Sequence, residues 1–481
     1  MKQKKRVQPK STPVTNSAPE FLDLLRNLVM RFDFLILFIL IYIVYNTVSR
    51  MTMSGDTNPA AFLPLSLILH QTVNFDAFVG AGLGPNVAYA FPLVNGHYVS
   101  LFPIVTPVLI TPVYFVSYML YTVFQIPFDI TSVMILAKTS ATIIAALSCV
   151  FVYLAGKELF SQKIALFTAL VYAFATSTWS VSSQALWQHG TVELLLILMV
   201  YLVIKNERVQ SRKTIILLGL LSGLFLFNRP PDAVLLLPII GYVVWYERQN
   251  LPIYAISAAI SGLPFLVYNL SVFGNVFGGY TQNLGLFAFS FDSIGNFIGL
   301  LIAPNVGMFI FSPVLVMAVL GYRKLHTISS VRIRQVLYIF GPAIVLQILV
   351  YSFFGFWESS VAFSYGQRFL TGFIPVLAIF IGIGVNEYFI EEPDSKTRAV
   401  QTIIILLVVS SVIIQAIGVF CYPLLPDRGS SSERTWDWDH DIIIESCLYG
   451  ISHIDSITTY SFPPLPPLLH LQFDKTGATS P

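Results

Sequence analysis

Long apolar runs separated by short polar loops set the pattern of this chain. A membrane-spanning helix needs roughly 20 mostly apolar residues, and eleven runs come close to or reach that length. They cover residues 33–49, 131–155, 164–181, 190–205, 213–228, 232–247, 252–271, 305–322, 335–356, 370–387 and 399–420. The pattern therefore predicts an all-α polytopic membrane protein with about eleven transmembrane helices.

A twelfth apolar stretch, residues 101–123, is long enough to span but contains Pro103, Pro107 and Pro112. Basic residues decide its placement, because short cytoplasmic loops collect Lys and Arg. The basic loops lie at residues 157–163, 205–213, 248, 323–334 and 396–398. They fall on one side of the membrane only if residues 101–123 do not span. We therefore expect this stretch to form a re-entrant or interfacial pair of jaw-like helices within an outer loop.

This topology divides the chain into a cytoplasmic tail (1–32), a transmembrane domain (33–420) and an extracytoplasmic C-terminal tail (421–481). The transmembrane domain includes a long first extracytoplasmic loop, residues 50–130. The N-terminal 30 residues lack the short apolar core and cleavage site of a signal peptide, so the first span is expected to anchor itself. Because both large extramembrane segments face outward, the chemistry is expected on the outer side.

Composition excludes several classes of protein. Only 11% of the 481 residues are charged and 55% are hydrophobic, whereas soluble domains carry about 25% charged residues. The 27 basic and 25 acidic residues leave a net charge of +2, which speaks against nucleic-acid binding. Three cysteines are too few for a disulfide framework or a cysteine-based metal site. No Walker, GxSxG or HExxH motif occurs, so no nucleotide site and no metal site are assigned, and a divalent metal stays open.

Three cations stand at the predicted outer ends of three different spans: Lys138, Arg229 and Arg368. Charges near a bilayer are costly, so those that are retained tend to be functional. Each cation alone can be read as snorkelling to lipid phosphate. Three that reach the same level favour a site for a phosphate or pyrophosphate.

Acidic residues at the same level are candidates for catalysis. Asp56 follows the first span in a Gly- and Pro-containing turn that can fix a carboxylate just above the membrane; the alternative is an Asx turn or a helix N-cap. Glu193 is an intramembrane acid, either functional or paired with Lys138. Asp76, Glu358 and Asp232 are weaker candidates, because loop carboxylates are usually solvated.

Other polar residues complete the set of candidate substrate contacts: Gln188, His189 and Tyr365. A lone histidine in this position more often caps a helix or orients a neighbour than binds a metal. In the tail, Cys421 and Cys447 both lie on the predicted oxidising side. A disulfide between them is one hypothesis, and two free cysteines in an irregular tail are the alternative.

Several short motifs occur in an order that spans about residues 33–440. They are Gly55-Asp56-Thr57-Asn58-Pro59, Tyr98-Val99-Ser100-Leu101-Phe102-Pro103, Val152-Tyr153-Leu154-Ala155-Gly156-Lys157-Glu158-Leu159-Phe160, Leu186-Trp187-Gln188-His189-Gly190, Asn228-Arg229-Pro230, Ser364-Tyr365-Gly366-Gln367-Arg368-Phe369 and Trp436-Asp437-Trp438. Together with an acid directly after the first span, they resemble the GT-C superfamily of membrane glycosyltransferases. The stretches are similar to bacterial relatives of protein O-mannosyltransferases and of the lipid A aminoarabinose transferases.

The resemblance implies sugar transfer from a polyprenyl-phosphate-linked donor to a glycan, lipid or protein acceptor. Transfer would occur on the outer face of a membrane, with the bacterial plasma membrane fitting best, and Asp56 would be catalytic. Many members have two adjacent acids, but here Thr57 follows Asp56, so no second acid and no metal-bridging role are carried over. The chemistry suits the residues: a carboxylate can act as general base toward the acceptor hydroxyl. The three cations can stabilise charge on the departing phosphate.

A polytopic transporter or lipid flippase is the main alternative, since such proteins also carry a few intramembrane charges. A transporter is expected to show inverted repeats and polar elements on both faces. This sequence concentrates its polar residues and long loops on one face, which favours transfer chemistry. A structural or assembly subunit is a third possibility, and it would tolerate the loss of Asp56.

Overall fold

The computed structural model describes residues 32–48, 55–79, 89–281, 287, 293–359, 364–389, 393–422 and 432–452. Most of the predicted N-terminal tail, parts of the first outer loop and the end of the C-terminal tail lie outside these ranges. Within them, seven helical segments are long and apolar enough to cross a membrane. The all-α polytopic prediction is therefore confirmed, whereas the count of eleven spans is not established.

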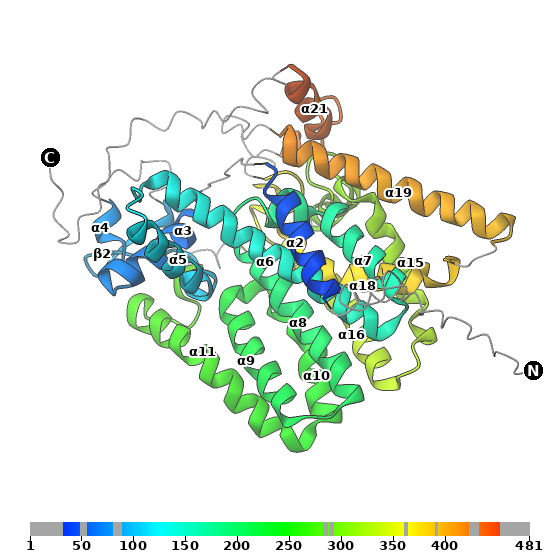
Figure 1. The fold of residues 1–481 in the computed structure, drawn as a ribbon, viewed down its shortest axis with the longest axis horizontal. Coiled ribbons are helices and arrows are strands. Elements are labelled where there is room, and N and C mark those ends of the chain that lie inside the picture. The colour runs from blue at the N-terminus through cyan, green and yellow to red at the C-terminus, as the bar shows by residue number, and fades with distance from the viewer. Residues whose placement is uncertain are drawn as a thin grey trace, which may run out of the picture.

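Within the described residues the helices follow one another along the chain, and two short strands form a small sheet (Figure 1). They are α2 (Asp33–Tyr45), α3 (Asn58–Leu65), α4 (Asp76–Val79), α5 (Val105–Val123), α6 (Ile130–Leu159), α7 (Gln162–Phe174), α8 (Gln188–Arg208), α9 (Arg212–Asn228), α10 (Leu237–Tyr246), α11 (Leu251–Phe273), α13 (Ser293–Ile302), α14 (Met308–Phe311), α15 (Met317–Arg323), α16 (Val331–Ser352), α18 (Ile374–Val385), α19 (Ser395–Phe420), α20 (Ser432–Thr435) and α21 (Ile442–Ser452). Strands β1 (Leu93–Val94) and β2 (His97–Tyr98) pair antiparallel.

Two of the predicted spans are interrupted where prolines fall. The run over 305–322 divides into α14, a 3₁₀ turn at Pro313–Val316 and α15. The run over 232–247 begins as a 3₁₀ helix, Pro230–Leu236, before α10. Proline lacks the N–H that a continuous helix needs at these positions, so a pattern of apolar residues alone overstates the length of these helices.

The prediction of a helix pair over residues 101–123 is wrong, because α5 is one continuous helix of 19 residues. Pro103 precedes the helix, and Pro107 lies in its first turn, where N–H groups have no intrahelical partner. Only Pro112 removes a bond from the interior. Helices α3, α4 and α5 lie together on one side of the molecule (Figure 1), so helices within residues 50–130 are confirmed. Helix α5 is also one of the seven that are long and apolar enough to cross a membrane, so its placement in an outer loop stays a prediction.

Small residues allow α9 and α11 to pair closely. Gly219 and Gly223 lie one turn apart on α9. A methyl group at these positions would stand 2.4 Å from the Tyr254 carbonyl oxygen and 2.2 Å from that of Ala258. Close approach of backbones through small residues at this spacing is a common means of helix association in membranes. Any larger side chain at either position would push α11 away from the bundle.

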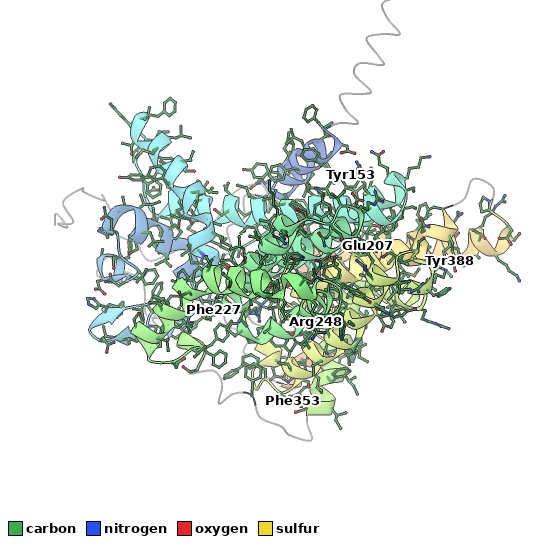
Figure 2. The ribbon with its side chains drawn as sticks, turned by 90° about the horizontal axis from the view of Figure 1, so that it is seen from below. Tyr153, Glu207, Phe227, Arg248, Phe353 and Tyr388 are labelled. Atoms are coloured by element: carbon green, nitrogen blue, oxygen red, sulfur yellow. The ribbon has the colours of Figure 1, made fainter. Side chains whose placement is uncertain are left out.

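The basic loops gather at one end of the bundle. Arg208 pairs with Glu158 at 2.8 Å and Arg332 with Glu207 at 3.6 Å, while Lys324 also bonds to a glutamate. Glu207, which pairs with Arg332, and Arg248, in the turn before α11, are labelled in Figure 2. Helices α6 and α8 run from the opposite end toward these loops. The positive charges that the sequence assigns to the cytoplasm therefore share one end of the structure.

This arrangement predicts the accessibility of two exposed loops, tested in a variant whose native cysteines are replaced. Val209→Cys, at a side chain 69% exposed, should react with an impermeant thiol reagent only after the membrane is opened. Asn95→Cys, at the exposed tip between β1 and β2, should react in intact cells. Labelling of Val209→Cys in intact cells would contradict the orientation.

Candidate functional site

Asp56 and Arg368 form an ion pair that joins the first outer loop to the segment before α18. Arg368 Nη2 lies 3.1 Å from Asp56 Oδ2. The other carboxylate oxygen accepts a hydrogen bond of 2.5 Å from the Tyr89 hydroxyl. Thr57, not Asp56, stands at the N-cap of α3, so the capping alternative for Asp56 does not describe it. Two residues predicted from separate regions of the sequence are thus in direct contact.

Tyr89 is held as a hydrogen-bond donor. Burial, and then the adjacent charge of Asp56, raises the pKa of the Tyr89 hydroxyl well above its usual value. The phenol therefore stays protonated and donates to the carboxylate at any ordinary pH. The bond fixes the direction of Asp56 without neutralising it.

The guanidinium of Arg368 lies between aromatic rings. Its central carbon is 4.7 Å from the centroid of the Trp187 ring and 5.0 Å from that of Phe369. The local turn is set by Gly366, at φ +80°, and by a 3.0 Å bond from the Thr371 hydroxyl to the Arg368 carbonyl. Arg368 Nε and Nη1 are buried and lack a hydrogen-bond partner among the described residues. The side chain is therefore fixed by stacking, with donors still to be satisfied.

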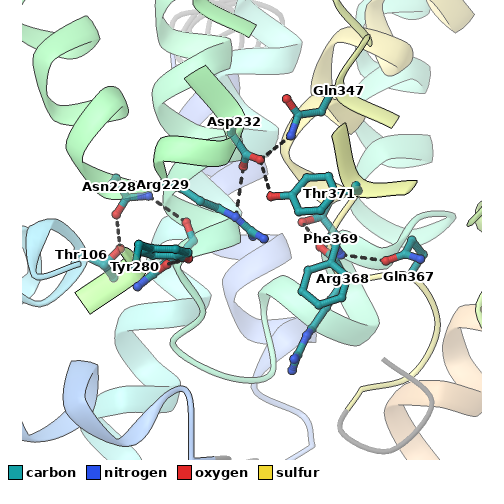
Figure 3. A network of polar contacts seen from close by, with 12 residues as sticks. Thr106, Asn228, Arg229, Asp232, Tyr280, Gln347, Gln367, Arg368, Phe369 and Thr371 are labelled. Carbon is teal, nitrogen blue, oxygen red and sulfur yellow. Dashed lines mark hydrogen bonds and ion pairs between the residues drawn. The ribbon is translucent and has the colours of Figure 1, made fainter. Parts of the chain in front are cut away.

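Arg229 approaches the same ring from the end of α9 (Figure 3). Its guanidinium carbon lies 5.7 Å from the Phe369 centroid and 5.2 Å from that of Tyr351. Asp232, three residues on, forms an ion pair of 3.4 Å with Arg229 Nε. Within the described part of the chain, Nε and Nη1 of Arg229 also lack hydrogen-bond partners. Phe369 thus separates two buried arginines that each have unsatisfied donors.

His189 lies with these two arginines, in the first turn of α8. Its ring is 6.1 Å from the Phe369 centroid and is close enough to both guanidiniums for their charges to act on it. Neither ring nitrogen has a hydrogen-bond partner in the described ranges, although the residue is only 7% exposed. A buried imidazole without partners is costly, so both ring nitrogens are available to a bound ligand.

Tyr280 and Gln188 form the neighbouring wall. The Tyr280 hydroxyl donates to Gln188 Oε1 at 3.0 Å, and Gln188 Nε2 makes a longer bond of 3.4 Å to the Pro103 carbonyl. Burial raises the pKa of Tyr280 to about 12, and the charges of both arginines and of Asp56 also act on it. Tyr280 therefore lies within electrostatic reach of Arg229, Arg368 and their acidic partners Asp232 and Asp56.

The cluster fits an anion. An unsatisfied buried donor costs about 1–3 kcal/mol, more when it is charged. Guanidinium groups match the oxygens of phosphate by charge-assisted and often paired hydrogen bonds. We call Asp56, His189, Arg229, Arg368 and Phe369 the arginine cluster. It has the donors, burial and aromatic packing that a phosphate group needs.

Lys138, the third predicted cation, makes different contacts. Its ammonium is buried and donates to the Ser183 carbonyl at 2.9 Å and to Gln184 Oε1 at 2.7 Å. Both of these acceptors are neutral and belong to the segment before α8. The structure therefore brings two of the three cations to one aromatic ring and holds Lys138 through another segment.

Glu193 lies one helical turn below His189 on α8. It accepts hydrogen bonds from the hydroxyls of Tyr172, at 2.6 Å, and Thr178, at 3.1 Å, and from that of Ser182. These hydroxyls, and not Lys138, are its hydrogen-bond partners. Because the donors come from α7 and from the segment before α8, the carboxylate joins two neighbouring parts of the bundle.

Tyr365 and Glu358 make contacts that position the chain. The Tyr365 hydroxyl donates to the Ile414 carbonyl of α19 at 2.9 Å. Glu358 accepts a bond of 3.3 Å from Thr435 in the C-terminal segment, and burial raises its pKa. Asp76 accepts from the Tyr98 backbone at 2.8 Å and so anchors β2.

The hypothesis of a Cys421–Cys447 disulfide is wrong for this structure, because the two cysteines are not bonded to each other. The C-terminal segment is held instead by Asn305. Its side-chain amide donates to the Arg434 carbonyl at 2.7 Å, and its oxygen accepts from Ile442 N at 2.6 Å. The hydrogen bonds of the buried Asn305 amide, and not a disulfide, thus hold the C-terminal segment.

Sequence reasoning missed Tyr89, Tyr280 and Phe369 and ranked Asp232 low. Nothing in the pattern around Tyr89 or Tyr280 distinguishes them from other loop aromatics, since only the tertiary fold brings them to the cluster. The sequence around Asp232 does indicate that it lies close to Arg229. In Arg229-Pro230-Pro231-Asp232 two prolines favour a tight turn, which places the acid over the arginine.

The contacts of Glu193 predict its effect on stability. Glu193→Leu leaves three buried hydroxyls without an acceptor, each worth about 1–3 kcal/mol, so the melting temperature in detergent should fall markedly. Glu193→Gln keeps an accepting oxygen and should cost less. A Glu193→Leu protein that melts at the parent temperature would show that these bonds do not stabilise the fold.

Comparison with known proteins bears on what this site does. A family model described as dolichyl-phosphate-mannose-protein mannosyltransferase matches residues 111–272. Comparison with curated proteins gives no significant match. Among solved structures, the apo crystal structure of the Archaeoglobus fulgidus oligosaccharyltransferase is similar, with a TM-score of 0.51 and 11% sequence identity. The similarity covers 81% of this chain and 56% of that chain, and at this identity it shows the fold alone. The family model and the solved structure both belong to the GT-C superfamily of membrane glycosyltransferases, which is therefore what this chain is similar to.

Proposed function

We propose that the protein transfers a sugar from a polyprenyl-phosphate-linked donor to an acceptor hydroxyl. The observation that carries the proposal is the contact between Arg368 and Asp56, at 3.1 Å. It places a carboxylate directly beside a group of buried, unsatisfied donors. A phosphate held by those donors would have its attached sugar within reach of the carboxylate.

The arginines suit the departing phosphate. As the bond between the sugar C1 and the phosphate oxygen breaks, the electron pair stays with the lipid phosphate. Donors fixed in advance around that oxygen stabilise the transition state more than the ground state. Arg229 and Arg368 are fixed by their packing against Phe369 and so need little rearrangement. His189 lies beside Phe369, within electrostatic reach of both arginines, and can contribute a ring nitrogen to the same phosphate.

Asp56 suits the general base. The acceptor oxygen forms a bond to C1 while its proton passes to the carboxylate. In the structure Arg368 occupies one oxygen of Asp56 and Tyr89 the other. A bound phosphate competes for Arg368, so donor binding exposes Oδ2 while Tyr89 keeps the carboxylate oriented. The base is thereby made available when the donor is present.

The remaining candidates take secondary roles in this proposal. Lys138 keeps a place in donor binding, because its buried ammonium contacts only neutral acceptors among the partners described above. Gln188 lies on the wall that faces the sugar or the acceptor. The contacts of Glu193, Tyr365 and Glu358 favour structural roles. A polyprenyl chain would enter from the lipid side, and the acceptor can be a glycan, a lipid or a protein.

We place the site on the extracytoplasmic face of an integral membrane protein, in the bacterial plasma membrane. Support comes from the opposite end of the bundle, where Arg208 and Arg332 meet their acidic partners. Short basic loops mark the cytoplasmic side of membrane proteins. The tail 1–32, the domain 33–420 with its loop 50–130, and the tail 421–481 keep their predicted sides in this proposal.

Asp56→Asn separates chemistry from binding. The substitution removes the base, so single-turnover release of polyprenyl phosphate from the sugar donor should fall about 10²–10⁴-fold. It also removes the partner of Arg368, so affinity for polyprenyl phosphate should be equal to the parent's or higher. Both are measured on purified protein in nanodiscs, with Asp76→Asn as a control that removes a loop carboxylate bonded to β2. Near-parental turnover in Asp56→Asn would exclude the role.

A further inference from the structure

We infer that Asp232 is a fixed counter-ion that limits how tightly the site holds the leaving lipid phosphate. The inference rests on the proposed function, because it concerns the same phosphate site. Asp232 forms an ion pair with Arg229 beside the arginine cluster. It differs from Asp56 in being unable to leave its arginine.

Two side chains of α16 hold the Asp232 carboxylate in place (Figure 3). Its Oδ1 accepts hydrogen bonds from Gln347 Nε2 at 2.6 Å and from the Tyr351 hydroxyl at 2.7 Å. It is 1% exposed, and the Asp232 backbone N–H bonds to the Arg229 carbonyl at 3.0 Å in the 3₁₀ turn. A carboxylate held in this way cannot swing toward a substrate or collect a proton from an acceptor.

Space for the carboxylate is provided from the α18 side. Gly372 lies so close that a methyl group there would stand 3.2 Å from Asp232 Oδ2 and 2.8 Å from a methyl of Val192. Position 372 therefore has room for glycine but little room for a side chain. The carboxylate is thus enclosed on several sides, and its negative charge there is stabilised by the hydrogen bonds from Gln347 and Tyr351 and by Arg229.

The rings, and not Asp232, set the direction of Arg229. Its guanidinium lies against both Tyr351 and Phe369. The 3.4 Å ion pair lacks the geometry of a hydrogen bond, since Arg229 Nε has no such partner in the described residues. What Asp232 adds to Arg229 is thus mainly negative charge, which cancels that of the arginine.

This cancellation has a consequence for turnover. Binding that is equally strong before and after reaction does not raise the rate, and slow product release often limits an enzyme. Two uncompensated buried guanidiniums would hold the polyprenyl phosphate product tightly. A fixed counter-ion under one of them weakens that hold while leaving its N–H donors aimed at the phosphate. Arg368, whose partner Asp56 is 25% exposed, supplies the exchangeable charge.

The sign of the change in affinity tests the inference. Asp232→Asn should bind polyprenyl phosphate about tenfold more tightly than the parent, because one negative charge beside the ligand is lost. Single-turnover transfer should persist while steady-state turnover falls through slow release. If the substitution instead damages the fold, or if Asp232 serves only to orient Arg229, binding of polyprenyl phosphate would weaken or stay unchanged. Either result overturns the inference.

A comparison made in the Arg229→Gln variant keeps the inference testable if Asp232→Asn alone fails to fold. Arg229→Gln should weaken binding, and Asp232→Asn added to Arg229→Gln should restore part of the affinity, because the pair is then neutral again. A double variant that binds no more tightly than Arg229→Gln would contradict the inference. A parent protein that does not bind polyprenyl phosphate in nanodiscs, or binds phosphatidylglycerol equally well, would instead contradict the proposed function.

Discussion

The burial of two arginine side chains against one phenylalanine is the constraint on which the end of the bundle opposite the basic loops depends. Arg229 and Arg368 are 3% and 5% exposed and share the ring of Phe369. Charges this deeply buried must be paired, since an uncompensated one costs several kcal/mol. The protein pairs each arginine with an acid and leaves other N–H groups unsatisfied. The result is a site whose charge is balanced and whose hydrogen-bonding capacity is still available to an anion.

The bundle delivers these groups from helix ends. α8 begins at the site with His189, α9 ends there with Arg229, and Arg368 lies shortly before α18. Residues at helix ends can be held by the packing of the whole helix while their side chains reach a common point. The segment between α2 and α5 then adds Asp56 and Tyr89. The site is therefore made where rigid helices and a single loop meet, and the loop supplies the group proposed to accept the proton.

Much of this was predictable from the order of apolar and charged residues. The polytopic fold, the shared end of the basic loops and the choice of Asp56, Arg229 and Arg368 as site candidates follow from hydropathy and from the cost of charges near a membrane. The structure brings these three residues together. The exact breaks at Pro313 and Pro230, and the continuity of α5, depend on where each proline falls within a turn. Runs of apolar residues do not show this.

The partners of the charged residues were harder to predict. Nothing in the sequence near Arg368 indicates that Asp56, more than 300 positions earlier, is its ion-pair partner. Lys138 and Glu193, which the pattern suggested as a possible pair, instead bond to neutral groups. Only the tertiary packing decides between such alternatives, because many polar side chains lie at the same depth.

The central claim is that the arginine cluster binds the phosphate of a lipid-linked sugar donor. The most direct test is a cryo-EM structure of the protein in nanodiscs with added polyprenyl phosphate. The account predicts phosphate oxygens within about 3 Å of the guanidiniums of both Arg229 and Arg368, with Asp56 no longer bonded to Arg368. Density for the phosphate elsewhere in the membrane, with the Asp56–Arg368 pair intact, would contradict it.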